Sequence, residues 1–246
     1  MSFRRTFGLT VPLSLLLLLG GGAAPPLSSE TPTSPSPAGG PVLDDSLNSP
    51  ETPARRVPSS WNRVSLWIGG SSLNSRLIGK IPRSTLGMLG LRYHRRLAPT
   101  PGTPRATGLT YTYTIDVMPL VAVSIPSGTV PKTSLSDQVV FTDGLTTYGV
   151  GLAPIGLRLN YRTRTPVEPY IAGSTGALYF RRALPDGRGE RINFMVDAGA
   201  GLQIGLTSQT TLSVGYRYHH LSNGFRGEVN PGLDSHLFHV GLTVVP

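Results

Sequence analysis

The chain has no cysteine among its 246 residues, and only two of its basic residues are lysines, Lys80 and Lys132. Without cysteine there is no disulfide, no thiolate metal site, no cysteine nucleophile and no lipidated cysteine anchor. Only 14% of the residues are charged, whereas about 25% are charged in an ordinary soluble domain. Glycine and proline occupy 30 and 23 positions. This composition argues against a solvent-exposed enzyme, a coiled coil or a helical protein.

The formal net charge is +9, and almost all of the excess is arginine. The first 56 residues hold four arginines and four acidic residues, so the excess lies in residues 57–246. Because the guanidinium fork suits phosphate groups, nucleic acid and phosphorylated lipid are the two partner classes to weigh.

The N-terminus is typical of a secretory signal. An arginine pair precedes an apolar run over 7–19, and small residues follow up to Ala24. The run is too short for a membrane-spanning helix of about 20 residues. Nine prolines with serine and threonine then favour a flexible linker. We expect a signal peptide over 1–24, a disordered linker over 25–58 and a folded domain over 59–246.

Residues 191–206 show the clearest periodicity in the chain. Odd positions are chiefly polar or glycine, and even positions are apolar. The apolar set comprises Ile192, Phe194, Val196, Ala198, Ala200, Leu202, Ile204 and Leu206. Alternation with a period of two predicts a strand with one apolar face. A strand of about 15 residues exceeds the usual 3–10 of soluble proteins and suits a membrane.

The same pattern predicts eight strands, with a change of phase at Pro154 that we interpret as a bulge. The expected strands cover 63–70, 85–95, 108–121, 146–161, 168–181, 191–206, 211–221 and 235–245. An even number of alternating strands predicts an all-β fold, an eight-stranded antiparallel up-and-down transmembrane β-barrel of the outer-membrane type. A soluble secreted barrel of the lipocalin type is the alternative, since parity alone does not assign the inner face.

The connections after the second, fourth and sixth strands are shorter on average than the others, and the longest covers 122–145. Short periplasmic turns and longer outer loops are typical of such barrels. The outer loops would carry a cationic rim that could pair with lipopolysaccharide phosphates. It comprises Arg76, Lys80, Arg83, Arg181, Arg182, Arg188 and Arg226. We take Arg182, Arg188 and Arg226 as the substrate-phosphate candidates.

Three polar residues extend the lipid-facing rows of the last two strands at their outer end: His220, Ser222 and Asp234. Polar groups facing hydrocarbon are costly unless they are paired and functional. A histidine and a serine two apart on one strand face lie about 6.6 Å apart at Cα, within reach of a hydrogen bond. We expect Ser222 as nucleophile, His220 as base and Asp234 as the acid that orients it. The backbone at Asn223 and Gly224 could stabilise an oxyanion.

The stretch Y-R-Y-H-H-L-S-N-G…N-P-G-L-D over about 25 residues resembles the C-terminal signature of the outer-membrane lipid A 3-O-deacylase family, also known as acyloxyacyl hydrolases. The resemblance implies catalytic His220 and Ser222, an acidic partner at Asp234 and an oxyanion role for Asn223. The best-known members carry glutamate at the acidic position, so the shorter Asp234 must lie closer or be assisted by a loop. The chain also ends in V-V-P, where an aromatic residue commonly closes such barrels.

These observations together predict an outer-membrane esterase that removes the 3-O-linked acyl chain from lipid A of lipopolysaccharide. No metal or cofactor is expected, because the sequence has no ligand-spaced cluster, P-loop or dinucleotide fingerprint. The secretory signal and the absence of basic-aromatic clusters argue against nucleic acid as a partner. A non-catalytic barrel that binds lipid or a partner through its arginine-bearing loops is the alternative function.

Overall fold

The computed structural model describes residues 62–97 and 108–245, so the expected signal peptide and linker lie outside the described residues. None of the described residues belongs to a helix long and apolar enough to cross a membrane. The strands are β1 (Asn62–Ser71), β2 (Thr85–Arg96), β3 (Gly108–Ile125), β4 (Gly128–Pro131), β5 (Val139–Thr142), β6 (Leu145–Arg162), β7 (Val167–Leu184), β8 (Glu190–Gly205), β9 (Thr210–Ser222) and β10 (Leu233–Val244).

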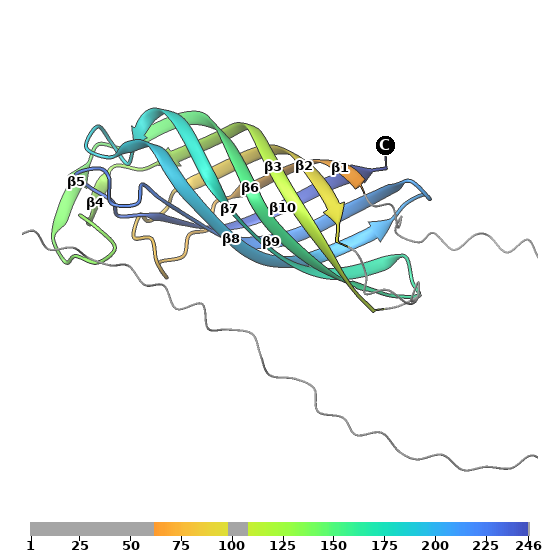
Figure 1. Cartoon of the computed structure of the whole chain (residues 1–246). Helices are drawn as coiled ribbons and strands as arrows, with labels where there is room; N and C mark the ends of the chain where they lie inside the picture. The colour runs from red at the N-terminus through yellow and green to blue at the C-terminus, as the bar shows by residue number, and fades with distance from the viewer. Residues whose placement is uncertain (1–61, 98–107, 246) are drawn as a thin grey trace, which may run out of the picture. The chain divides into compact units, whose positions relative to one another are not determined.

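Eight of these strands form one closed antiparallel barrel in the order β1-β10-β9-β8-β7-β6-β3-β2 (Figure 1). Each strand pairs with its neighbours along the barrel, and β1 closes on β10, so no strand edge is left free. The predicted all-β, eight-stranded antiparallel barrel is therefore confirmed. The change of phase at Pro154 is a bulge: the β6–β7 register shifts between Leu152 and Ile155.

The two faces of the barrel wall have opposite chemistry. On β1, Ser65 and Trp67 are buried inside, whereas Leu66 and Ile68 are 54% and 58% exposed on the outer surface. The other barrel strands repeat this alternation, which gives the outer wall a continuous apolar band. Exposure of such a band to water is unfavourable, whereas contact with the hydrocarbon of a bilayer is favourable. The polar interior is the reverse of a lipocalin, and the protein is a barrel of the outer-membrane type.

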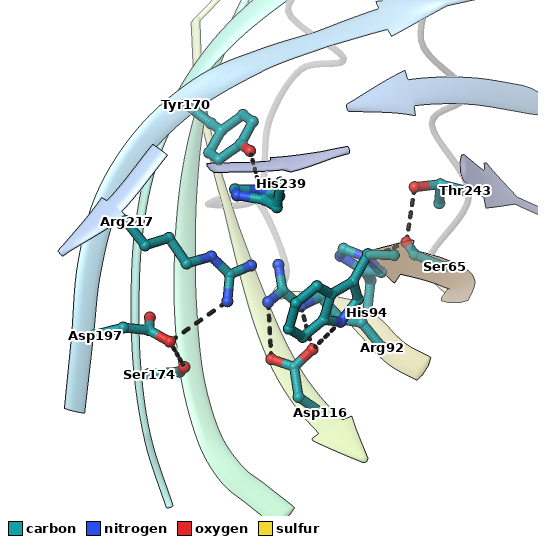
Figure 2. Close-up of polar contacts among 11 residues, drawn as sticks. Ser65, Arg92, His94, Asp116, Tyr170, Ser174, Asp197, Arg217, His239 and Thr243 are labelled. Atoms are coloured by element: carbon teal, nitrogen blue, oxygen red, sulfur yellow. Dashed lines mark hydrogen bonds and ion pairs between the residues drawn. The ribbon is translucent and has the colours of Figure 1, made fainter. Parts of the chain in front are cut away.

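Charged side chains fill the barrel interior. Arg92 donates to both carboxylate oxygens of Asp116 at 2.7 and 2.8 Å (Figure 2). The Trp67 indole donates to Oδ1 of the same carboxylate at 2.9 Å. Arg217 pairs with Asp197 at 3.4 Å in a second cluster. Buried charges are tolerated only when they are paired and hydrogen-bonded, as these are. The interior therefore acts as a polar core that fixes the strands.

The two ends of the barrel differ. The turns 163–166 and 206–209 lie at the end where β10 finishes, close to the C-terminus (Figure 1). The connections at the opposite end include 72–84 and 223–232, together with the β4–β5 hairpin. That hairpin was not predicted: it lies within the long connection that we expected between the third and fourth strands.

Candidate active site

The candidate residues meet where β9 ends and β10 begins, on the side of the barrel that carries the long connections. His220 and Asp234 are directly paired in the antiparallel register. Ser222 is two residues further along β9 and is paired with Phe194 of β8. Because alternate residues of a strand share a face, His220 and Ser222 both lie on the outer wall.

His220 and Asp234 form a close hydrogen-bonded pair. His220 Nδ1 donates to Asp234 Oδ1 at 2.6 Å, a length typical of a charge-assisted bond. The Asp234 side chain is fully buried, and 13% of the His220 side chain is exposed. A proton held on Nδ1 leaves Nε2 as the acceptor nitrogen of the imidazole. This arrangement is what a general base requires.

Asp234 follows the parity that the sequence predicts, yet it does not face hydrocarbon. The connection between β1 and β2 covers it, and the Ile78 N–H donates to Asp234 Oδ2 at 2.8 Å. Neither Ile78 nor its loop was among the residues predicted for the site. Strand periodicity carries no signal for such a contact, because it depends on where an irregular loop lies.

Ser222 is half-buried, and its hydroxyl accepts a long bond of 3.4 Å from the Gly224 N–H. Within the described residues, no hydrogen bond joins Ser222 to His220. Catalytic hydrogen bonds are often long or absent in free enzymes and tighten when substrate binds. The structure thus places the two side chains on one face without joining them.

Asn223 is buried, and its donors are used inside the loop that follows β9. Its N–H donates to Asn230 Oδ1 at 3.0 Å, and its Nδ2 donates to Val229 O at 2.8 Å. Gly224 has a φ of 66°, in the left-handed region that favours glycine. The Asn223 contacts hold this turn, and the turn directs the Gly224 N–H towards Ser222.

The three candidate arginines are in different settings. The Arg226 guanidinium lies 4.9 Å above the ring of Phe194, the residue paired with Ser222, and donates to Asn223 O at 3.0 Å. Arg188 is bound to Asp186 at 2.6 Å, and this hydrogen bond lowers the pKa of the Asp186 carboxyl below its usual value. Arg182 is exposed near the outer end of β7. Arg226 is therefore the arginine that the structure links to the neighbourhood of Ser222.

The structure of the outer membrane enzyme PagL is 20% identical, with a TM-score of 0.49, and the match covers 73% of this chain and 97% of that one. Neisserial surface protein A is 13% identical with a TM-score of 0.41, and the match covers 75% and 97%. No curated protein sequence matches.

A family model described as lipid A 3-O-deacylase (PagL) matches residues 126–243. The matched segment contains His220, Ser222 and Asp234, but not the β1–β2 connection. The sequence signature had pointed to the same family. Over this segment the chain is similar to the lipid A 3-O-deacylase family, which is a family of ester hydrolases.

Proposed function

We propose that this protein hydrolyses the ester at the 3-position of lipid A in the outer leaflet, with Ser222 as nucleophile, His220 as general base and Asp234 as the orienting acid. The observation that carries the proposal is the 2.6 Å His220–Asp234 pair on the outer wall of the barrel, two residues from a serine on the same face. An imidazole oriented by a carboxylate next to a hydroxyl is the arrangement of acyl-transfer enzymes on unrelated folds.

In the first half of the reaction, Ser222 Oγ attacks the ester carbonyl carbon while His220 Nε2 accepts the hydroxyl proton. Negative charge then develops on the carbonyl oxygen beside the Gly224 N–H, which is our candidate oxyanion donor. Collapse of this intermediate breaks the bond between the acyl carbon and the sugar oxygen. His220 returns the proton to that oxygen, so the sugar leaves as an alcohol and the acyl chain stays on Ser222.

Water completes the cycle. His220 takes a proton from a water molecule, which attacks the acyl carbon, and the proton then returns to Ser222 Oγ as the free fatty acid leaves. The outer-wall position suits this chemistry, because the apolar band contacts acyl chains while the adjoining loops contact water. Asn223 supports the turn that carries Gly224.

Arg226 is the first candidate for binding a lipid A phosphate, and exposed Arg182 is the second. Arginine recognises phosphate through paired hydrogen bonds. We give Arg188 a smaller part, because Asp186 already neutralises it. Lipopolysaccharide is therefore the proposed partner of the outer loops.

The test is the mass spectrum of lipid A from cells that express the parent, Ser222→Ala or His220→Ala. The parent should remove the 3-linked acyl chain, and both variants should leave it in place. His236→Ala is the matched control: His236 lies on the neighbouring strand β10 and is hydrogen-bonded to Tyr216, outside the proposed machinery. If either site variant deacylates at the parental rate, the proposed mechanism is wrong. A folded parent that leaves lipid A unchanged would favour the non-catalytic barrel.

A further inference from the structure

The connection between β1 and β2, residues 72–84, is bound to the start of β10 by main-chain hydrogen bonds. The Lys80 N–H donates to Pro231 O at 2.8 Å, and the His236 N–H donates to Leu73 O at 3.0 Å. Asn74 Nδ2 adds a bond of 3.0 Å to the carbonyl oxygen of Asp234. The loop is thus bound to residues that precede and follow Asp234 in the sequence. These contacts define its path over Asp234.

Both oxygens of the Asp234 carboxylate are engaged. Oδ1 accepts from His220 Nδ1 at 2.6 Å, and Oδ2 accepts from the Ile78 N–H at 2.8 Å. The side chain has no solvent-exposed surface. A carboxylate held at one oxygen can still rotate, whereas one held at both oxygens presents a fixed orientation to its histidine. The Ile78 bond therefore helps to fix the carboxylate plane against which the imidazole is aligned.

Gly79 is the residue that allows this close approach. A Cβ at position 79 would lie 2.7 Å from Leu233 N, 2.8 Å from Asp234 N and 2.8 Å from Asp234 Oδ1. Two of these three atoms are main chain and cannot move away as the end of a flexible side chain can. Any side chain here must displace either the loop or the carboxylate.

A second glycine, Gly232 of the connection between β9 and β10, lies against Gly79. Gly232 has a φ of 67°, and a Cβ at this position would lie 3.2 Å from Gly79 Cα and 3.1 Å from His220 Cε1. The two glycines therefore pack their main chains together beside the imidazole and the carboxylate. A side chain at position 79 would press on the Asp234 carboxylate, and one at position 232 would press on the His220 ring.

We propose that Gly79, through the Ile78 N–H, is a positioning residue that aligns the Asp234 carboxylate with His220. This inference rests on the proposed function of the pair, and it assigns a part in catalysis to a loop outside the segment that the family model matches. Gly79 contacts no substrate; it acts through Asp234.

The test is a double-mutant cycle of Gly79→Ala and Asp234→Asn, in which initial rates of acyl release are measured with purified folded protein. In the parent background, Gly79→Ala should lower kcat by about 10- to 100-fold with little change in KM, because a displacement near 1 Å is enough for such a loss. In the Asp234→Asn background, the same change should cost less than about 2-fold, since residues that act through one another are not additive. Gly87→Ala is the control, because a Cβ there meets nothing within 4 Å.

If Gly79→Ala does not fold, as judged by heat-modifiable migration, Asn74→Ala takes its place in the cycle. This variant removes the side-chain bond to the Asp234 carbonyl and leaves Gly79 unchanged. An equal loss in both backgrounds, a loss in KM alone or a parental kcat would overturn the inference. Failure of the proposed function is distinguished by Ser222→Ala: if that variant is inactive while Gly79→Ala is fully active, only the positioning role is wrong.

Discussion

His220 and Asp234 are directly paired residues of β9 and β10, and 2.6 Å separates His220 Nδ1 from Asp234 Oδ1. The pair lies on the outer wall of a barrel whose interior holds its own arginine–carboxylate pairs. The interior pairs are part of the fold, whereas the outer pair lies beside a serine. This separation allows the site and the scaffold to be tested independently.

Replacement of Asp234 by asparagine should lower kcat by about 10³- to 10⁴-fold, as the loss of the acid does in other serine hydrolases. Asparagine has nearly the same shape but cannot stabilise the imidazolium that forms in the transition state. Initial rates of fatty-acid release from lipid A in detergent give the measurement. Asp186→Asn removes a carboxylate that binds Arg188 instead and serves as the control. A kcat within a few-fold of the parent would show that the carboxylate is not part of the mechanism.

Gly224→Ala should abolish most activity while the barrel remains folded. At a φ of 66° an alanine is strained, and its Cβ would lie 3.0 Å from the Phe194 ring. The turn must then change, and the N–H moves away from Ser222; loss of one oxyanion donor costs about 10²- to 10³-fold in kcat. Gly187→Ala, at an outer-loop glycine whose Cβ meets nothing within 4 Å, should be active. Equal rates for the two variants would exclude Gly224 from the oxyanion site.

Arg226→Gln should raise KM for lipid A by about 10- to 100-fold, the equivalent of one hydrogen bond to a charged group. A neutral p-nitrophenyl ester has no phosphate, so its hydrolysis should change little. The comparison of the two substrates separates phosphate binding from any disturbance of the loop, because Arg226 also donates to Asn223 O. A similar loss on both substrates would mean that Arg226 only supports the loop.

Arg92→Met should destabilise the barrel by about 3–5 kcal/mol, because it leaves the buried Asp116 charge unpaired. The double variant Arg92→Met/Asp116→Asn should recover part of this loss, since asparagine is neutral and still accepts the Trp67 indole bond. Urea unfolding in detergent measures both values. The folded fraction of each variant should retain its deacylase activity. If the double variant is less stable than Arg92→Met, the interior charges do not act as a pair.

Alternation was sufficient to predict the barrel, because each strand needs one apolar and one polar face. The eight expected ranges lie close to the observed barrel strands, such as 211–221 for Thr210–Ser222. The β4–β5 hairpin was missed because its strands have only four residues each, too few for a period to be recognised. Its pairing depends on the loop closing on itself.

The site was predicted only in part, for a related reason. Parity placed His220, Ser222 and Asp234 on one face, but parity cannot show what covers a residue. Asp234 is buried by a loop about 155 residues earlier in the chain, through contacts of Ile78 and Gly79 that follow no period. The donors of Asn223 could likewise be assigned only once Val229 and Asn230 were seen to accept from them.

Covalent labelling of the folded barrel with an alkyl fluorophosphonate, followed by peptide mass spectrometry, shows directly whether Ser222 is an activated nucleophile. An activated serine attacks such a probe, whereas an ordinary hydroxyl does not. Ser222 alone should carry the label, and His220→Ala should abolish it in protein that still shows heat-modifiable migration. A folded barrel that takes up no label, or takes it up at another residue, would show that Ser222 is not an activated nucleophile.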